Sequence, residues 1–299
     1  MPPEAGFLLR ATTRSGELIG RTLPLPARLK QGVKQALIAL AFARADGAIA
    51  SYPKSGRTWL RFILANYFDL VFDLGLAIDL HSMFRVIPND QLDDARGRRA
   101  FGYQRRPEVP FLFASHAPYR RSLFAGKRLL FMLREPKDLM VSAYFHQARH
   151  RGWPGGIKAF LRDPGAGLAD YLRYSNRWAE RLDAHPHLTV SYERLAGDTA
   201  GVVHAVLELF AVRVDPTALG EAIERSRFER MRAIEAAKGL PGDRPERGQA
   251  EERRVRKGKI GGFRDYLDAD DVAFIYRGCR AGLSPAAQQL LARVGLALE

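Results

Sequence analysis

The chain has 299 residues, of which 46% are hydrophobic and 27% charged, and its formal net charge is +14. This composition is ordinary for a soluble globular protein of one or two domains. The single cysteine, Cys279, excludes an internal disulfide and suits a reducing, cytoplasmic location. Since no histidine pair has the spacing of a zinc site either, we expect no metal.

The first 45 residues are expected to form an N-terminal arm, and residues 46–299 the main domain. Within the arm, helical periodicity predicts an amphipathic helix over 27–44. Its apolar face consists of Leu29, Val33, Leu37 and Leu40. The apolar run is too short to span a bilayer. We therefore expect this helix to pack against the domain; the alternative is contact with an anionic membrane surface.

Residues 49–61 have the sequence IASYPKSGRTWLR. They predict a buried strand over 47–52, a glycine turn, and a helix over 57–72. The backbone N–H groups and the positive dipole end of that helix would meet at the turn, which favours a phosphate or sulfate site. Lys54, Ser55 and Thr58 would add a cation and two hydroxyl groups. The ATPase pattern G-x-x-x-x-G-K-[ST] is not matched, because this lysine precedes the glycine.

Strands and helices alternate along the remaining chain. Strand-like runs recur at 111–115, 128–133 and 187–192, and helical runs at 136–150, 167–183, 198–211, 216–236 and 268–296. This order predicts an α/β fold: a P-loop-like, three-layer arrangement with a mostly parallel central sheet flanked by helices. Ligands of such folds bind beyond the carboxyl ends of the strands. The segments expected to converge there are Tyr52-Pro53, Ser115-His116, Leu133-Arg134 and Tyr192-Glu193.

Residues 73–108 have no clear periodicity and are predicted to be irregular. Four of their side chains are candidates to line a substrate mouth: His81, Met83, Phe84 and Ile87.

Several motifs in this order resemble those of sulfotransferases that use 3′-phosphoadenosine 5′-phosphosulfate (PAPS). SYPKSGRTW (51–59) is similar to their 5′-phosphosulfate loop, with Arg57 where a small polar residue is usual. LLFMLREPKDLMVSAYFH (129–146) is similar to their 3′-phosphate motif. RKGKIGGFR (256–264) resembles their R-K-G-x-x-G loop, with Gly262 and Phe263 replacing an acid and a tryptophan. ASHAP (114–118) resembles the segment that carries the catalytic histidine, with Ala114 replacing a lysine.

The resemblance implies in-line transfer of a sulfuryl group from PAPS to a hydroxyl or amine. His116 would be the base, Lys54 would stabilise the leaving group, and Ser142 would complete the catalytic set. The implied nucleotide contacts are Lys54, Ser55, Gly56, Arg57, Thr58, Trp59, Arg134, Ser142, Tyr192, Ser226, Phe228, Arg256, Lys257 and Gly258. Trp59 would stack on the adenine, and Arg134 and Ser142 would hold the 3′-phosphate. Arg57 is a candidate to replace the cation absent at position 114.

Two other functions are left open by the residues alone. A P-loop-type nucleotide or sugar kinase would need a Walker lysine and a magnesium-binding acid, and neither is evident. An inactive, basic nucleic-acid-binding relative would use the positive charge, but no base-reading motif is present, so we expect no specific nucleic acid. The acceptor could be a small molecule, a glycan or a lipid, and the oligomeric state is not indicated.

Overall fold

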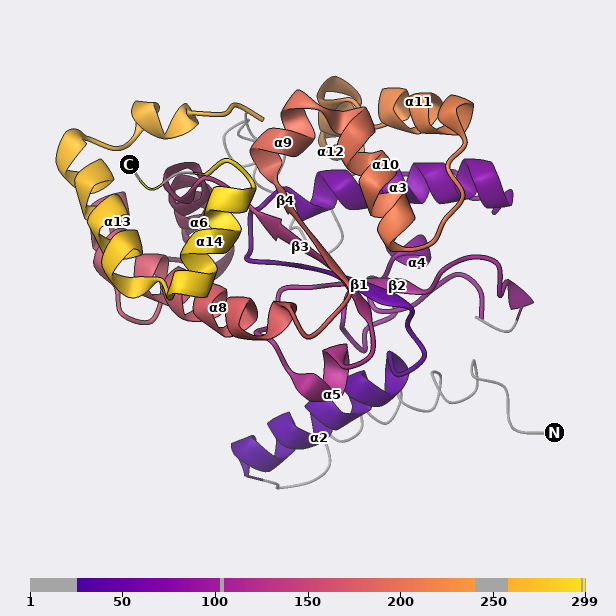
Figure 1. Ribbon diagram of the computed structural model, residues 1–299, viewed down its shortest axis with the longest axis horizontal. Coiled ribbons are helices and arrows are strands. Elements are labelled where there is room, and N and C mark those ends of the chain that lie inside the picture. The colour runs from indigo at the N-terminus through magenta and orange to yellow at the C-terminus, as the bar shows by residue number, and fades with distance from the viewer. Residues whose placement is uncertain (1–25, 103–104, 240–257, 297, 299) are drawn as a thin grey trace.

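The computed structural model of the chain describes residues 26–102, 105–239, 258–296 and 298 (Figure 1). Its centre is one sheet of parallel strands in the order β2-β1-β3-β4. The strands are β1 (Gly47–Ser51), β2 (Leu112–Ser115), β3 (Arg128–Leu133) and β4 (His187–Ser191). Every residue of β1 and β2 is buried, which explains their continuous apolar sequences. The predicted α/β class with a central parallel sheet is confirmed.

Helices cover both faces of the sheet, so the predicted three layers are also confirmed (Figure 1). Against Ile49 and Leu130 pack helices α3 (Arg57–Phe72), α4 (Met83–Val86), α10 (Thr199–Leu209), α11 (Pro216–Arg225) and α12 (Phe228–Lys238). Against Ala48 and Phe131 pack α2 (Ala27–Ala41), α5 (Arg121–Phe124), α6 (Pro136–Arg151), α7 (Ile157–Arg162), α8 (Gly167–Leu182), α13 (Ala269–Gly282) and α14 (Pro285–Arg293). Ala48 and Ile49 face opposite layers because side chains alternate along a strand.

Two predicted helices are each divided in the structure. The run 216–236 breaks between α11 and α12 at Ser226, which is fully buried and accepts a hydrogen bond from Asn66 Nδ2. The run 268–296 breaks before Pro285, whose ring suits the first position of a new helix and not a helix interior. Helices α5, α7, α9 (Tyr192–Gly197) and the 3₁₀ turn η3 (Gly262–Asp265) were not predicted, and neither was α4, which lies within the segment 73–108 predicted to be irregular; such short elements have little periodicity.

The N-terminal helix forms as predicted, but two of the four residues predicted to pack against the domain are exposed. Leu29 and Leu40 are 51% and 61% exposed, whereas Ile38 and Phe42 are buried against the sheet. The centres of the Phe42 and Phe113 rings lie 4.8 Å apart, and this aromatic contact favours packing of the helix through the face that carries Ile38. The division into an arm and a domain at residue 45 stays a prediction. Within the described ranges, no helix has the length and apolar character needed to cross a membrane.

Candidate active site

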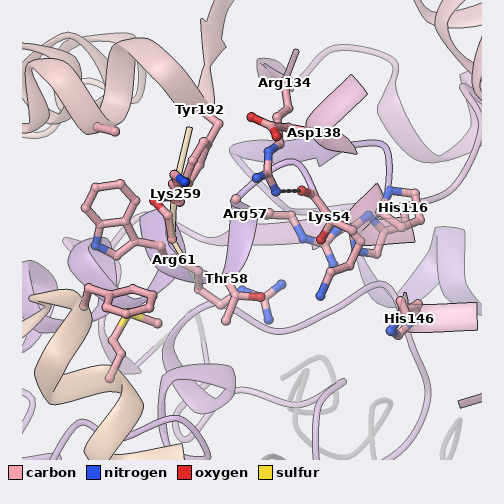
Figure 2. A pocket seen from close by; sticks show the side chains of 18 of the residues that line it. Lys54, Arg57, Thr58, Arg61, His116, Arg134, Asp138, His146, Tyr192 and Lys259 are labelled. Atoms are coloured by element: carbon pink, nitrogen blue, oxygen red, sulfur yellow. Dashed lines mark hydrogen bonds between the residues drawn. The ribbon is translucent and has the colours of Figure 1, made fainter. Parts of the chain in front are cut away.

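A cavity of about 850 Å³ lies at the carboxyl end of the sheet. Its lining takes Lys54 from the loop after β1, His116 from the end of β2, Arg134 from the end of β3 and Tyr192 from the end of β4. The parallel register brings these four strand ends to one edge, as the sequence predicted. Figure 2 shows Tyr192 and His116 on opposite sides of the cavity, with Lys54 and Arg57 between them.

The loop after β1 has a backbone that only particular residues tolerate. Gly56 has φ +89°, and a Cβ atom built there would lie 2.5 Å from the Tyr192 ring. Lys54 also has positive φ, at +75°. No side chain among the described residues caps the start of α3, so its first N–H groups remain available beside Lys54 and Thr58. This loop has the backbone geometry of an anion-binding site.

Two of the expected nucleotide contacts shape the site from behind its surface. Ser55 is buried, and its hydroxyl donates to the Tyr52 carbonyl at 2.9 Å, so it closes the turn instead of facing the cavity. Ser226 is buried as well, and its carbonyl accepts a hydrogen bond from Trp59 Nε1 at 3.0 Å. Neither residue lines the cavity, so the side chains of Ser55 and Ser226 are not placed to contact a ligand there.

The side of the cavity opposite His116 is aromatic. Trp59, Tyr192 and Phe228 all line it, and the rings of Trp59 and Tyr192 meet edge to face at 6.0 Å. Gly258 adjoins them: its carbonyl accepts a hydrogen bond from the Tyr192 hydroxyl at 3.1 Å, and a Cβ at this position would approach the Phe228 ring to 2.7 Å. This side can therefore receive a flat ring. Arg256 and Lys257, the other two residues expected from this motif, lie outside the described residues.

Arg134 connects the two halves of the predicted phosphate-binding apparatus. Its Nη1 donates to the Lys54 carbonyl at 3.1 Å, and its guanidinium lies 4.6 Å from the centre of the Tyr192 ring. The Nε atom of Arg134 is buried without a hydrogen-bond partner. Ser142, from α6, lines the same cavity. Lys54, Arg134 and Ser142 are thus close enough to contact a single ligand, as the resemblance requires.

His116 has a defined tautomer in this structure. Its Nδ1 lies 2.8 Å from the Ser51 carbonyl, and because a carbonyl can only accept, Nδ1 carries the proton. The Nε2 lone pair is then available to accept a proton from a ligand. His116 is exposed towards the cavity, but the protein packed around the ring disfavours its charged form; this desolvation, followed by the charge of Arg57, holds its pKa well below the usual 6.5. The imidazole is therefore neutral at pH 7.

Asp138 is a site residue that the sequence reasoning missed. Its Oδ2 accepts a hydrogen bond from Gly261 N at 2.6 Å, and its Oδ1 accepts one from Phe263 N at 2.8 Å. The carboxylate thereby fastens the loop of the third motif to α6. The sequence signal that could have revealed it is its position: Asp138 is the last residue of REPKD and lies in the first turn of the helix in the second motif.

The remaining lining residues that had no predicted role lie partly within the quoted motifs and partly in segments without a recognisable pattern. They are Pro53, Arg61, Asn89, Gln91, Arg96, His146, Arg151, Ala196, Glu229, Met231, Lys259 and Gly262. Of the four predicted mouth residues only Phe84 lines the cavity. Met83 and Ile87 are fully buried in the core, and His81 Nε2 lies 3.1 Å from the Gly239 carbonyl.

The fold and this site define an α/β protein that binds an anionic nucleotide-sized ligand at the carboxyl end of a parallel sheet. Residues 44–293, most of the chain, match the sequence model of the Sulfotransferase domain. The chain therefore belongs to the sulfotransferase family, and the predicted class of enzyme, a PAPS-dependent sulfotransferase, is confirmed.

Individual relatives are distant but cover much of the chain. The 3-beta-hydroxysteroid sulfotransferase of Cavia porcellus is 22% identical over 80% of this chain and 85% of its own. Cytosolic sulfotransferase 17 of Arabidopsis thaliana is 26% identical over 77% and 72%. Among solved structures, retinol dehydratase with androsterone and inactive cofactor PAP has a TM-score of 0.58 and 20% identity, with 85% of each chain covered. Mouse sulfotransferase SULT7A1 with PAP has a TM-score of 0.55 and 19% identity, with 83% of this chain and 89% of its own covered.

Proposed function

We propose that this sulfotransferase moves a sulfuryl group from PAPS to a hydroxyl or amine of a small-molecule, glycan or lipid acceptor. The observation that carries the proposal is the hydrogen bond between Arg134 and the Lys54 carbonyl, within one cavity that Ser142 also lines. Two motifs that the resemblance assigns to phosphate binding, about 80 residues apart in sequence, would thereby face a common ligand. The PAP bound in the crystal structures of retinol dehydratase and SULT7A1 supports this donor.

The residues of the cavity fit such a nucleotide. The start of α3, with Thr58 and Lys54, would bind the 5′-phosphosulfate, and Lys54 would offset the charge that develops on the leaving oxygen. Arg134 offers a planar fork for the 3′-phosphate, and its unpartnered Nε fits that role. Trp59 and Phe228 would hold the adenine, which favours aromatic surroundings. PAPS supplies the sulfuryl group; the protein supplies position and charge.

The acceptor proton would pass to Nε2 of His116, since Nδ1 is engaged by Ser51. Arg57 would supply the cation that the resemblance expects at position 114. Ala114 is fully buried among core residues such as Ile49, whereas Arg57 lines the cavity and has a buried Nη1 without a hydrogen-bond partner. Burial lowers the pKa of Arg57 to about 10, so its guanidinium remains charged at neutral pH.

Calorimetry with adenosine 3′,5′-bisphosphate tests the donor assignment. We expect it to bind without metal about 10- to 100-fold more tightly than adenosine 5′-phosphate, because charge-assisted bonds hold the 3′-phosphate. Arg134→Met should remove most of this preference, while Arg128→Met, at the exposed start of β3, should retain it. Equal affinity for the two nucleotides, or a preference for ATP with magnesium, would contradict the assignment.

The pH dependence of kcat/KM for PAPS tests the state of His116. Its pKa lies below 6.5 in the free enzyme, so the ring stays an unprotonated base as the pH falls to that value. Activity should therefore be flat from pH 8 to 6.5 and decline only at lower pH. Arg57→Met removes one cause of the lowered pKa, so the acid limb of its residual activity should move to higher pH. A wild-type midpoint at or above 6.5 would refute this expectation.

A further inference from the structure

Three arginines of the cavity lining, Arg57, Arg61 and Arg96, lie close to one another, and Arg57 and Arg61 also lie close to His116. Arg57 and Arg61 lie four residues apart on α3, so they occupy neighbouring positions on one face of that helix. Both are buried, with 7% and 2% of their surface exposed. Two like charges are thus held close together in a place that excludes most water.

The described residues do not neutralise this group of charges. None of these three arginines forms an ion pair with a described acid. Arg61 donates through Nη2 to Asn89 Oδ1, a neutral partner, and lies 4.6 Å from the centre of the Phe84 ring. Its Nε, like Nη1 of Arg57, is buried without a hydrogen-bond partner.

One acid, Asp90, lies near these arginines, and it does not line the cavity. Its carboxylate accepts a hydrogen bond from the Ser115 hydroxyl at 2.8 Å. Burial raises the pKa of Asp90, although the Ser115 hydrogen bond and the charge of Arg57 lower it. Asp90 is the one acid near two buried guanidinium groups; PAPS would meet the charge of Arg57, which leaves Arg61 without an anionic counterpart. Burying charge without a partner is costly, so an arrangement of this kind indicates a ligand that brings the missing negative charge.

The lining around His116 offers little to an apolar acceptor. Apart from the arginines it contains Asn89, Gln91 and His146, and Phe84 is the large apolar side chain among the described residues there. A sterol or a retinoid would gain little apolar contact on these surfaces. A carboxylate, sulfate or phosphate would instead find planar donors of matching geometry.

We infer that the acceptor carries an anionic group, a carboxylate, sulfate or phosphate, which Arg61 binds while the acceptor hydroxyl faces His116 and the sulfuryl group beside Arg57. This inference rests on the proposed function. The donor nucleotide does not account for Arg61, because that residue lies one helical turn, or about 6 Å, beyond the start of α3 where phosphate binds. Arg96, half-buried in the cavity lining, would extend the same positive surface.

Acceptor pairs that differ chiefly in charge test the inference, and the comparison of wild type with variants cancels the difference in phenol acidity within each pair. We would compare 4-hydroxybenzoate with its methyl ester, and 4-hydroxybenzenesulfonate with its sulfonamide, by kcat/KM with PAPS and by calorimetry on the PAP-loaded protein. The wild type should prefer each anion. Arg61→Met should reduce that preference about 10- to 100-fold, because a charge-assisted bond to a buried group is lost. Arg61→Lys should restore part of it, and Arg96→Ala should cause a smaller loss without a risk to the core.

The control variant is Arg85→Met, an exposed arginine on α4 that does not line the cavity and should leave the preference unchanged. Affinity for adenosine 3′,5′-bisphosphate should stay the same in all variants. If the wild type binds anions and neutral analogues equally, or binds no anion, the inference is overturned while the donor assignment stands. If the bisphosphate itself fails to bind the wild type, the proposed function fails first.

Discussion

Replacing His116 by alanine is expected to lower kcat about 100- to 10,000-fold, the usual contribution of a positioned general base. The affinity for adenosine 3′,5′-bisphosphate should not change, since His116 lies on the side of the cavity opposite Tyr192 (Figure 2). The loss should be smaller with acceptors such as 4-nitrophenol that are already ionised at the assay pH, because they have no proton to give. Steady-state rates with ionised and neutral phenols measure this difference.

His204 provides the matched control for this variant. It is an exposed histidine of α10 whose Nε2 lies 3.4 Å from Glu208, and surface pairs of this kind contribute little to stability. His204→Ala should therefore keep the wild-type rate with both kinds of phenol. A His116→Ala enzyme of nearly normal rate, or one whose loss is equal for ionised and neutral acceptors, would show that His116 is not the base.

Replacing Gly56 by alanine should abolish nucleotide binding and transfer together. The backbone at Gly56 has φ +89°, and the new methyl group would lie 2.5 Å from the Tyr192 ring. Backbone strain of this kind costs about 1–3 kcal/mol by itself. Moving Tyr192 would also disturb its hydrogen bond to Gly258 and its contact with Arg134. We expect the affinity for adenosine 3′,5′-bisphosphate to fall at least about 100-fold, measured by calorimetry.

Gly75→Ala separates backbone strain from the steric effect. Gly75 also has positive φ, at +64°, but a Cβ there would meet no atom within 4 Å. This variant should lower the thermal midpoint slightly and leave nucleotide affinity unchanged. If Gly56→Ala loses no more affinity than Gly75→Ala, then the geometry of the loop is not what binds the phosphosulfate.

Local sequence was sufficient to predict the elements that carry the loops proposed to bind phosphate. The strand before Tyr52, the helix from Arg57 to Phe72 and the strand at 128–133 each depend on a continuous apolar run or a helical period within one segment. The order of strands and helices then indicated a parallel sheet, and a parallel sheet brings the strand ends together. For that reason the sequence alone is enough to assign Lys54, His116 and Arg134 to one site.

The part of the cavity around Arg61 could not be predicted in this way. In sequence, Arg61 is one more charge on a helix and Asn89 is part of an irregular segment; their meeting depends on how residues 83–92 pack against α3. Ser226 was likewise expected to touch the nucleotide, but Asn66 and Trp59, each about 160 residues earlier, engage it in the core. A contact between two segments that are far apart in sequence does not change the hydrophobic periodicity of either segment, so it cannot be predicted from that periodicity.

The sequence by itself determined the family, the parallel sheet and the loop with Gly56, because strand, turn and helix preferences act between neighbours in the chain. The tertiary structure alone decided which charges are buried without partners, which serines face inward, and which face of α2 packs against the sheet. Each of these depends on desolvation and close packing by residues that are remote in sequence, and neither effect exists until the chain has folded.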